Sequence, residues 1–156
     1  LQLGATTPSF ELEPPVDATF YTGHITGAKV KEALAKFIGR IEQIPPSYSA
    51  CKVDGKRAYD LARQGKEVEL KPKVLVIDEI ELQDFNPQTM QATIRVVCSK
   101  GTYIRALARD IGLALDSGAH LTALRRTRIG DYKVEECHTL ETFRQWLETL
   151  PNPTDK

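Results

Sequence analysis

The fold is decided by the stretch Val74-Leu-Val-Ile-Asp-Glu-Ile-Glu-Leu82, which is followed by Asn86-Pro87 and then by Gln91-Ala-Thr-Ile-Arg-Val-Val-Cys98. The first segment is apolar at its start and alternates towards its end, and the second segment alternates throughout. Alternation with a period of two is typical of strands that bury one face. Asn86-Pro87 favours a turn between them. The two segments are therefore predicted to pair as an antiparallel hairpin.

Helical patterns lie on both sides of this hairpin. Residues 103–115 place Ile104, Leu107, Ile111 and Leu115 on one stripe, which predicts a helix directly after the second strand. Upstream, Thr26 is a predicted N-cap, and the helix carries Val30, Leu34, Phe37 and Ile38, with Gly39 as its stop. Gln43 to Lys56 is irregular, and its Asp54-Gly55 pair predicts a hairpin turn. A short helix is expected over Arg57 to Gln64, and a short strand over Val68 to Leu70.

A last helix is predicted after the N-cap Thr139, ending before Pro151 and burying Leu140, Phe143, Trp146, Leu147 and Leu150. The sequence thus predicts an α+β fold with a mixed, mainly antiparallel sheet flanked by helices.

Composition restricts the class of protein. The 156 residues suit one domain, and the absence of a run of 18 apolar residues argues against a membrane span. Three distant cysteines without metal-ligand spacing predict neither disulfides nor a metal site, and favour a cytoplasmic location. The formal net charge is zero. Basic residues nevertheless gather in 51–73 and 98–133, which fits either a phosphate-binding face or solvated helices of mixed sign.

The best candidate site follows the second strand, at Ser99-Lys-Gly-Thr-Tyr-Ile-Arg105. A strand, a glycine turn and a helix start bring Lys100, Tyr103 and Arg105 to one sheet edge. An arginine in the first helical turn opposes the helix dipole, so an anionic partner is expected to offset the cost. The alternative is structural: Ser99 or Thr102 caps the helix, Tyr103 lies in the core and Arg105 on the surface.

Two further segments are candidates for RNA contact. One combines an aromatic ring with basic residues, and the other contains adjacent arginines. Tyr48 and Lys52 lie on the irregular segment, where a ring and a cation suit a base and a phosphate. Tyr48 as a loop anchor remains an equal alternative. Arg125 and Arg126 fit either nucleic acid or a solvated edge strand. His120 is interpreted as a structural hydrogen-bonding residue.

Three ordered motifs resemble the bacterial tRNA pseudouridine synthase B family. They are Leu3-Gly-Ala-Thr-Thr-Pro-Ser-Phe10, then Gln43-Ile-Pro-Pro-Ser-Tyr-Ser-Ala-Cys-Lys-Val-Asp-Gly-Lys-Arg-Ala-Tyr-Asp-Leu-Ala-Arg-Gln-Gly65, then Cys98-Ser-Lys-Gly-Thr-Tyr-Ile-Arg105 through Gly118-Ala-His-Leu-Thr-Ala-Leu-Arg-Arg126. The resemblance implies that the chain is part of a pseudouridine synthase catalytic fold. It also implies isomerisation of uridine 55 in the tRNA T-arm, on a base flipped out of its loop.

The resemblance assigns roles to individual residues. Tyr103 matches the tyrosine that packs on the target base and is a candidate for proton abstraction. Arg105 matches the arginine that pairs with the catalytic aspartate, and Leu124 matches the apolar residue that closes the pocket. Lys100, Arg125 and Arg126 are implied to lie near RNA, with Tyr48 and Lys52 near the root of a T-loop-gripping insertion at about 14–73. Residues 74–150 carry the Tyr, Arg and Leu part of the site.

The family's nucleophilic aspartate lies in a Gly-x-Leu-Asp-Pro motif, and no Leu-Asp-Pro occurs in this sequence. The chain is therefore expected to be the C-terminal part of the enzyme, inactive alone, without the C-terminal RNA-binding extension. Arg105 is expected to lack its carboxylate, and Glu11 departs from an expected aspartate. The resemblance implies that the whole enzyme is a monomer with tRNA as its partner. It implies no metal, no cofactor and no membrane association. The alternatives are a non-catalytic RNA-binding module and a metabolic α+β domain with basic surface segments.

Overall fold

The computed structural model describes residues 1–47, 52–53, 56–57, 63–65 and 70–150. Its contacts divide the chain into two compact units, Leu1–Ala123 and Leu124–Lys156. Each unit is described by itself. The mixed α+β architecture predicted from the sequence is confirmed, and every strand pairing between described residues is antiparallel.

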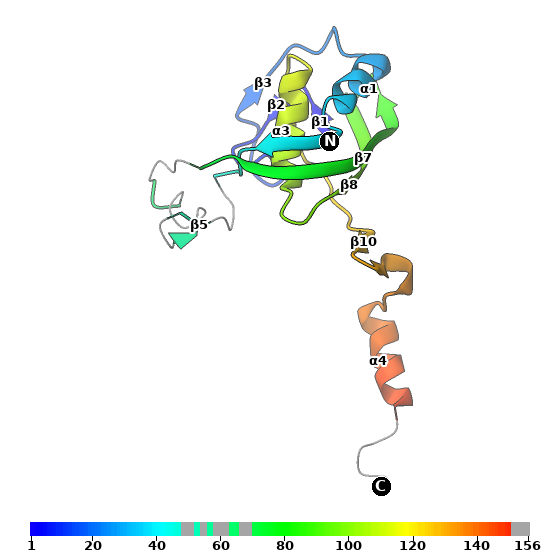
Figure 1. The fold of residues 1–156 in the computed structure, drawn as a ribbon. Helices are drawn as coiled ribbons and strands as arrows, with labels where there is room; N and C mark the ends of the chain where they lie inside the picture. The colour runs from blue at the N-terminus through cyan, green and yellow to red at the C-terminus, as the bar shows by residue number, and fades with distance from the viewer. Residues whose placement is uncertain (48–51, 54–55, 58–62, 66–69, 151–156) are drawn as a thin grey trace. The chain divides into compact units, whose positions relative to one another are not determined.

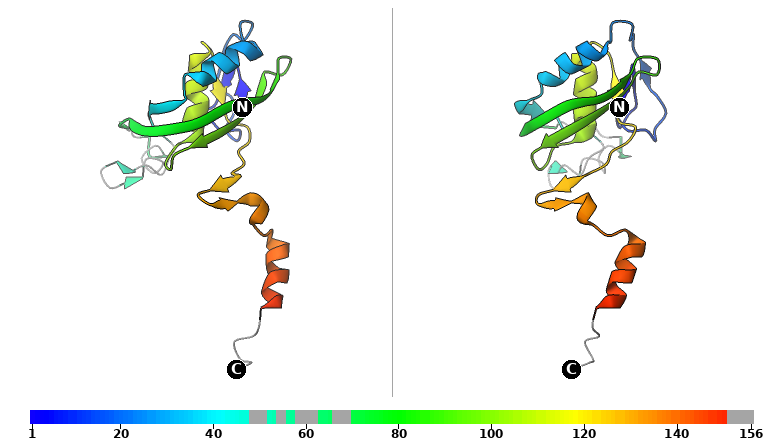
Figure 2. Two further views of the ribbon diagram at one scale, coloured as in Figure 1. Left: turned by 45° about the vertical axis from the view of Figure 1, so that its right-hand side comes forward. Right: turned by 90° about the vertical axis from the view of Figure 1, so that its right-hand side faces the viewer.

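The first unit is built on a five-stranded sheet in the order β4-β7-β8-β1-β9. Its strands are β1 (Gln2–Leu3), β4 (Gly39–Gln43), β7 (Lys73–Asn86), β8 (Gln91–Cys98) and β9 (Ala119–His120). The predicted hairpin is confirmed as the long pair β7–β8, which Figure 2 shows from two sides. The side chain of Asn86 accepts hydrogen bonds from the amides of Gln88 and Thr89 and so closes the turn.

The pairing of β7 with β8 shifts register between Ile77 and Glu79. Apolar side chains of β7 are buried both before and after this shift. Leu75 and Ile77 are buried before the shift and Ile80 after it. An inserted residue flips the side-chain alternation, so strict period-two spacing breaks at this point. On the exposed side Arg95 lies 2.7 Å from Glu79, and the hydrogen bond to that carboxylate raises the pKa of Arg95.

Two helices pack against this sheet, α1 (Gly27–Ala35) and α3 (Ile104–Ala114), as Figure 1 shows. Val30 and Leu34 of α1 meet Leu107 and Ile111 of α3 in one core with the strands. Thr26 is the N-cap of α1 as predicted and accepts a hydrogen bond from the amide of Lys29. The short pair β2 (Ala5–Thr6) and β3 (Ala18–Thr19) completes this unit beside β1.

The predicted end of α1 is wrong. The helix ends at Ala35, Phe37 and Ile38 lie in the following turn, and Gly39 is the first residue of β4. Gly39 has a φ of +98°, a backbone conformation that favours glycine, so its role is to redirect the chain into a strand. The short segment β4 was not expected from the sequence.

The predicted hairpin at Asp54-Gly55 is supported by its flanks, since β5 (Lys52–Val53) pairs with β6 (Lys56–Arg57). Residues 54–55 themselves lie outside the described residues, as do most of the short helix expected over 57–64 and the strand expected near 68–70.

The second unit contains the hairpin β10 (Arg128–Ile129) and β11 (Tyr132–Lys133), a 3-10 turn at Val134–Glu136 and α4 (Leu140–Thr149). Thr139 is the N-cap of α4 as predicted, and Thr142 completes a reciprocal capping box. The predicted burial of its apolar face is wrong. No residue of α4 is buried, and Leu140 is 93% exposed.

Candidate functional site

The candidate site begins where β8 turns into α3. The amide of Ser99 donates to the Val76 carbonyl, and its Oγ accepts from the Val76 amide, so the turn is fastened to β7. Gly101 has a φ of +85°, which a residue with a side chain rarely adopts. The Thr102 hydroxyl donates back to the Ser99 carbonyl. Neither Ser99 nor Thr102 caps α3, so the capping interpretation is wrong.

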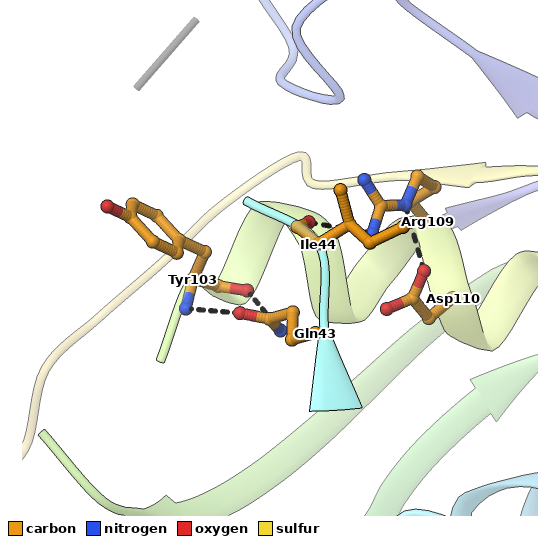
Figure 3. Close-up of polar contacts among 5 residues, drawn as sticks. All are labelled: Gln43, Ile44, Tyr103, Arg109 and Asp110. Atoms are coloured by element: carbon orange, nitrogen blue, oxygen red, sulfur yellow. Dashed lines mark hydrogen bonds and ion pairs between the residues drawn. The ribbon is translucent and has the colours of Figure 1, made fainter. Parts of the chain in front are cut away.

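Tyr103 occupies the N-cap position of α3 and has no side-chain cap of its own. Its backbone is held by the side chain of Gln43, the last residue of β4. Gln43 Oε1 accepts from the Tyr103 amide at 2.9 Å, and Gln43 Nε2 donates to the Tyr103 carbonyl at 3.1 Å. Figure 3 shows the Tyr103 ring pointing to the other side. The backbone is thus fixed from one side, with the phenol directed away.

Tyr103 is half-buried, so the alternative that places it in the core is wrong. The ammonium of Lys73 lies 5.6 Å from the ring centroid. A cation over an aromatic face is attracted by the ring quadrupole. Lys73 is also the strand partner of Gln43 across β4 and β7. Neighbouring strand ends therefore hold both the ring and the backbone of one tyrosine.

Arg105 pairs with Glu11, with 3.2 Å between Arg105 Nε and Glu11 Oε1. This carboxylate comes from the chain itself, and the expectation that Arg105 lacks the catalytic aspartate implied by the resemblance stays a prediction. A cation in the first turn of a helix is unfavourable against the dipole, and this carboxylate offsets it. The Arg105 side chain is 21% exposed, so a purely surface role is not what the structure shows. Glu11 reaches the guanidinium despite departing from the expected aspartate.

The loop that carries Glu11 is fixed on both sides. The Thr7 hydroxyl donates to the Glu11 carbonyl at 2.7 Å, and the Phe10 carbonyl accepts from the Leu121 amide at 2.8 Å. Phe10 has a φ of 59°, which is uncommon for a residue with a side chain. These bonds hold the backbone at the point where Glu11 meets Arg105.

Arg109 is one helical turn after Arg105 and was not singled out from the sequence. Its Nε pairs with Asp110 at 2.8 Å, and its Nη2 donates to the Ile44 carbonyl at 2.9 Å (Figure 3). Its guanidinium lies 5.8 Å from the Phe10 ring centroid. The spacing of four residues between the two arginines was the available signal, because it places both on one helix face.

The other predicted site residues are spread over the chain. Lys100 is exposed in the turn before Tyr103. Tyr48 lies outside the described residues, and Lys52 begins the β5–β6 hairpin. Leu124, Arg125 and Arg126 are exposed and belong to the second unit. The structure therefore brings together Tyr103 and Arg105, and the roles expected for the remaining residues stay predictions.

His120 is 4% exposed and its Nδ1 lies 2.9 Å from the Ala5 carbonyl oxygen, which confirms its structural interpretation. Within the part of the chain that the structure describes, no group of three or more His, Cys, Asp or Glu side chains is placed to hold a metal ion. Among the same residues, no helix is long and apolar enough to cross a membrane.

Comparison with known proteins covers almost the whole chain. Residues 1–104 match the family described as TruB family pseudouridylate synthase (N terminal domain), and residues 105–154 match the tRNA pseudouridylate synthase B C-terminal domain. A tRNA pseudouridine synthase B from Phocaeicola vulgatus is 68% identical over 148 residues, covering 95% of this chain and 62% of that protein. The protein of the same name from Bacteroides fragilis is 64% identical, with 95% and 63% covered.

The chain spans less than two thirds of the length of these relatives. Among solved structures, a chain of a crystal structure of a Cbf5-Nop10-Gar1 complex is similar, with a TM-score of 0.56 and 32% identity. That match covers 73% of this chain and 29% of the other. Two family matches that together extend from residue 1 to residue 154 decide the assignment. The chain belongs to the TruB family of pseudouridylate synthases.

Proposed function

We propose that this chain contributes the pocket wall and the RNA grip of a tRNA pseudouridine synthase that isomerises uridine 55 of the T-arm. The observation that supports this most directly is the start of α3. There Tyr103 is the N-cap and Arg105 lies in the first turn; Gln43 holds the backbone of Tyr103, and Glu11 pairs with Arg105. The proposed enzyme works in the cytoplasm as a monomer, without a metal or an organic cofactor.

In this proposal Tyr103 packs on the flipped uracil and is the candidate for proton abstraction during the rearrangement. Arg105 orients a catalytic aspartate and favours its ionised form, because a nearby positive charge stabilises a carboxylate. In this structure Glu11 Oε1 lies 3.2 Å from the Nε of the same guanidinium. Leu124 closes the pocket against water, which strengthens charge pairing inside it.

The nucleophilic aspartate is proposed to come from a segment that this sequence does not contain. The test compares this chain with the extended chain, meaning the same chain preceded by a segment that carries the family's Gly-x-Leu-Asp-Pro motif. A T-arm stem-loop RNA is the substrate, and pseudouridine formation is measured. We expect conversion by the extended chain and none by the chain alone. Conversion by the chain alone at a comparable rate would show that the nucleophile is one of its own residues.

The RNA grip is proposed to include Arg125 and Arg126, which are exposed and follow each other in the sequence. Replacing both by Ala is expected to weaken binding of a T-arm hairpin and to lower the slope of log affinity against log salt by about 1.4–1.8, from roughly 0.7–0.9 for each lost phosphate contact. The matched control replaces Arg40 and Arg95, two exposed arginines on β4 and β8, with the same change of charge.

The binding experiment also separates the two candidate functions. A hairpin that binds the extended chain in a salt-dependent way without conversion would favour a non-catalytic RNA-binding module. A slope that is unchanged in the Arg125→Ala/Arg126→Ala variant but lowered in the control would place the RNA on the sheet surface instead.

A further inference from the structure

Gln43 is a fully buried polar side chain, with 1% of its surface exposed. Burying an amide without hydrogen bonds is unfavourable, so a glutamine in this place requires partners. Its side-chain amide makes two hydrogen bonds to backbone atoms of Tyr103, a residue 60 positions later in the chain. The Gln43 amide therefore holds the backbone of Tyr103, the residue that the proposed function places against the substrate base.

The two hydrogen bonds are reciprocal. A primary amide offers a carbonyl acceptor and an N–H donor side by side, as a peptide group of a neighbouring strand does. The side chain of Gln43 thereby continues the pairing of β4 beyond its last residue and joins it to the start of α3. The Tyr103 carbonyl also accepts the first helical hydrogen bond, from the Leu107 amide at 3.0 Å. One carbonyl thus links the strand end and the helix.

A second contact fixes the helix further along. Ile44 follows Gln43, and its carbonyl accepts a hydrogen bond from Arg109 Nη2 at 2.9 Å. Tyr103 and Arg109 are separated by about 9 Å along the axis, at ~1.5 Å per residue. Two adjacent residues at the end of β4 therefore hold α3 at two points, as Figure 3 shows. Arg105 lies between these points, so its position follows from theirs.

We propose that Gln43 is a positioning residue of this site, which sets the start of α3 and thereby the placement of the Tyr103 phenol and the Arg105 guanidinium. This inference rests on the proposed function. Gln43 acts through the backbone of Tyr103 and does not touch the substrate. A misplacement of about 1 Å in a catalytic constellation can lower the rate by about 100-fold. The expected loss therefore falls on the chemical step and not on RNA binding.

A purely structural glutamine would behave differently. Its loss would lower the free energy of unfolding and the amount of folded protein, and the folded fraction would turn over normally. The split between kcat and KM, measured per folded molecule, separates the two roles. Hydrogen exchange of the Tyr103 amide gives a second readout, because that amide donates to Gln43 Oε1.

The first variant is Gln43→Leu, which keeps the approximate volume and removes both hydrogen bonds. In the extended chain we expect kcat to fall by about 10- to 100-fold with KM for the T-arm hairpin within about threefold of wild type. In the chain itself we expect the Tyr103 amide to lose exchange protection. The matched control is Gln91→Leu, at an exposed glutamine on β8, which is expected to leave both readouts unchanged.

The second variant, Gln43→Glu, keeps the test decisive where Gln43→Leu does not fold. The ionised carboxylate cannot donate to the Tyr103 carbonyl, whereas the neutral acid can both donate and accept. Burial raises the pKa of an introduced carboxyl, so the neutral form is regained on mild acidification. The rate relative to wild type is expected to rise as the pH is lowered from about 8 to about 5.5.

An unchanged kcat per folded Gln43→Leu molecule, or a Gln43→Glu rate that keeps a constant ratio to wild type across this pH range, would overturn the inference. An inactive wild-type extended chain would instead count against the proposed function. In that case the exchange of the Tyr103 amide still decides whether Gln43 fixes the start of α3, and full protection in Gln43→Leu refutes it.

Discussion

The ion pair between Glu11 and Arg105 contributes little to stability but bears on the direction of the Arg105 side chain. Their side chains are 46% and 21% exposed, and Glu11 Oε1 lies 3.2 Å from Arg105 Nε. A partly exposed ion pair of this kind contributes about 0–1 kcal/mol to stability. Its larger effect is to fix a long, flexible arginine in one direction at the start of α3. Glu11 is therefore expected to influence the reaction more than the fold.

The substitution Glu11→Gln tests this at the residue scale. It removes the charge and keeps the shape, so kcat of the extended chain is expected to fall by up to about tenfold, the equivalent of about 1.4 kcal/mol. The thermal midpoint is expected to stay within about 3 °C of wild type, since a partly exposed pair contributes little. Steady-state kinetics and thermal unfolding measure the two effects. Glu13→Gln, at a neighbouring exposed acid, is the control. An unchanged kcat, or equal losses in both variants, would contradict the prediction.

Sequence reasoning found Tyr103 and Arg105 because a strand, a glycine turn and a helix start lie together in the chain. It missed Gln43 because the partner of that residue is a backbone 60 positions away, and no local pattern marks such a contact. Glu11 was noted only as a departure from an expected aspartate. Which acid meets Arg105 depends on the path of the loop at Thr7–Glu11, which sequence spacing does not determine.

At the scale of elements, helix α3 lies close to strand β9 and the residue before it at Gly112. A β-carbon at this position would lie 2.6 Å from the Gly118 carbonyl carbon and also against the Ala119 nitrogen, both backbone atoms that cannot swing aside. The Ser117 amide donates to the Gly112 carbonyl and holds the turn between α3 and β9 against the helix end. Alanine is the better helix former. The close backbone contact therefore explains why glycine stands at this position.

Gly112→Ala therefore sets two opposing effects against each other. Helix propensity gains about 1 kcal/mol, whereas overpacking against a backbone costs about 1–3 kcal/mol and more where nothing can yield. We expect a net loss, seen as a fall of the thermal midpoint by at least about 3 °C, at about 2–4 °C per kcal/mol for a chain of this size.

Gly27→Ala is the matched control for this substitution. Its β-carbon would make ordinary contact with Phe85 at 3.6 Å in the first turn of α1. It is expected to raise the midpoint slightly, because the unfolded chain loses freedom. If Gly112→Ala stabilised the chain as much as Gly27→Ala, the close approach of α3 and β9 would not exist in solution.

The elements that sequence patterns predicted well are those with strong local signals. The β7–β8 hairpin follows from alternation around Asn86-Pro87. The start of α4 at Leu140 follows from its N-cap Thr139, whose side chain accepts a hydrogen bond from the Thr142 amide. β4 was missed because Gly39 has the same appearance as a helix stop and as the first residue of a strand. The choice between them is made by pairing with β7, a contact between distant segments.

At the scale of the whole chain, the buried core belongs to the first unit. The core cluster runs from Leu3 to Ala119, whereas residues 124–150 of the second unit are exposed apart from the half-buried Val134. A segment of this length rarely buries enough apolar surface to fold alone. Several large apolar side chains of α4 are exposed instead, Leu140, Phe143, Trp146, Leu147 and Leu150. We therefore expect the first unit to provide most of the free energy of unfolding. We expect the exposed apolar side chains of the second unit to promote self-association.

Removing residues 124–156 tests this division. Because the buried core lies in the remaining residues, the shortened chain is expected to keep its thermal midpoint within about 4 °C, the effect of about 1 kcal/mol. Contiguous exposed apolar surface promotes association. Light scattering at increasing protein concentration should therefore show self-association of the 156-residue chain and less of the shortened one. A shortened chain that unfolds or associates more strongly would mean that the second unit covers apolar surface of the first, and the apolar face of α4 would then have an intramolecular role.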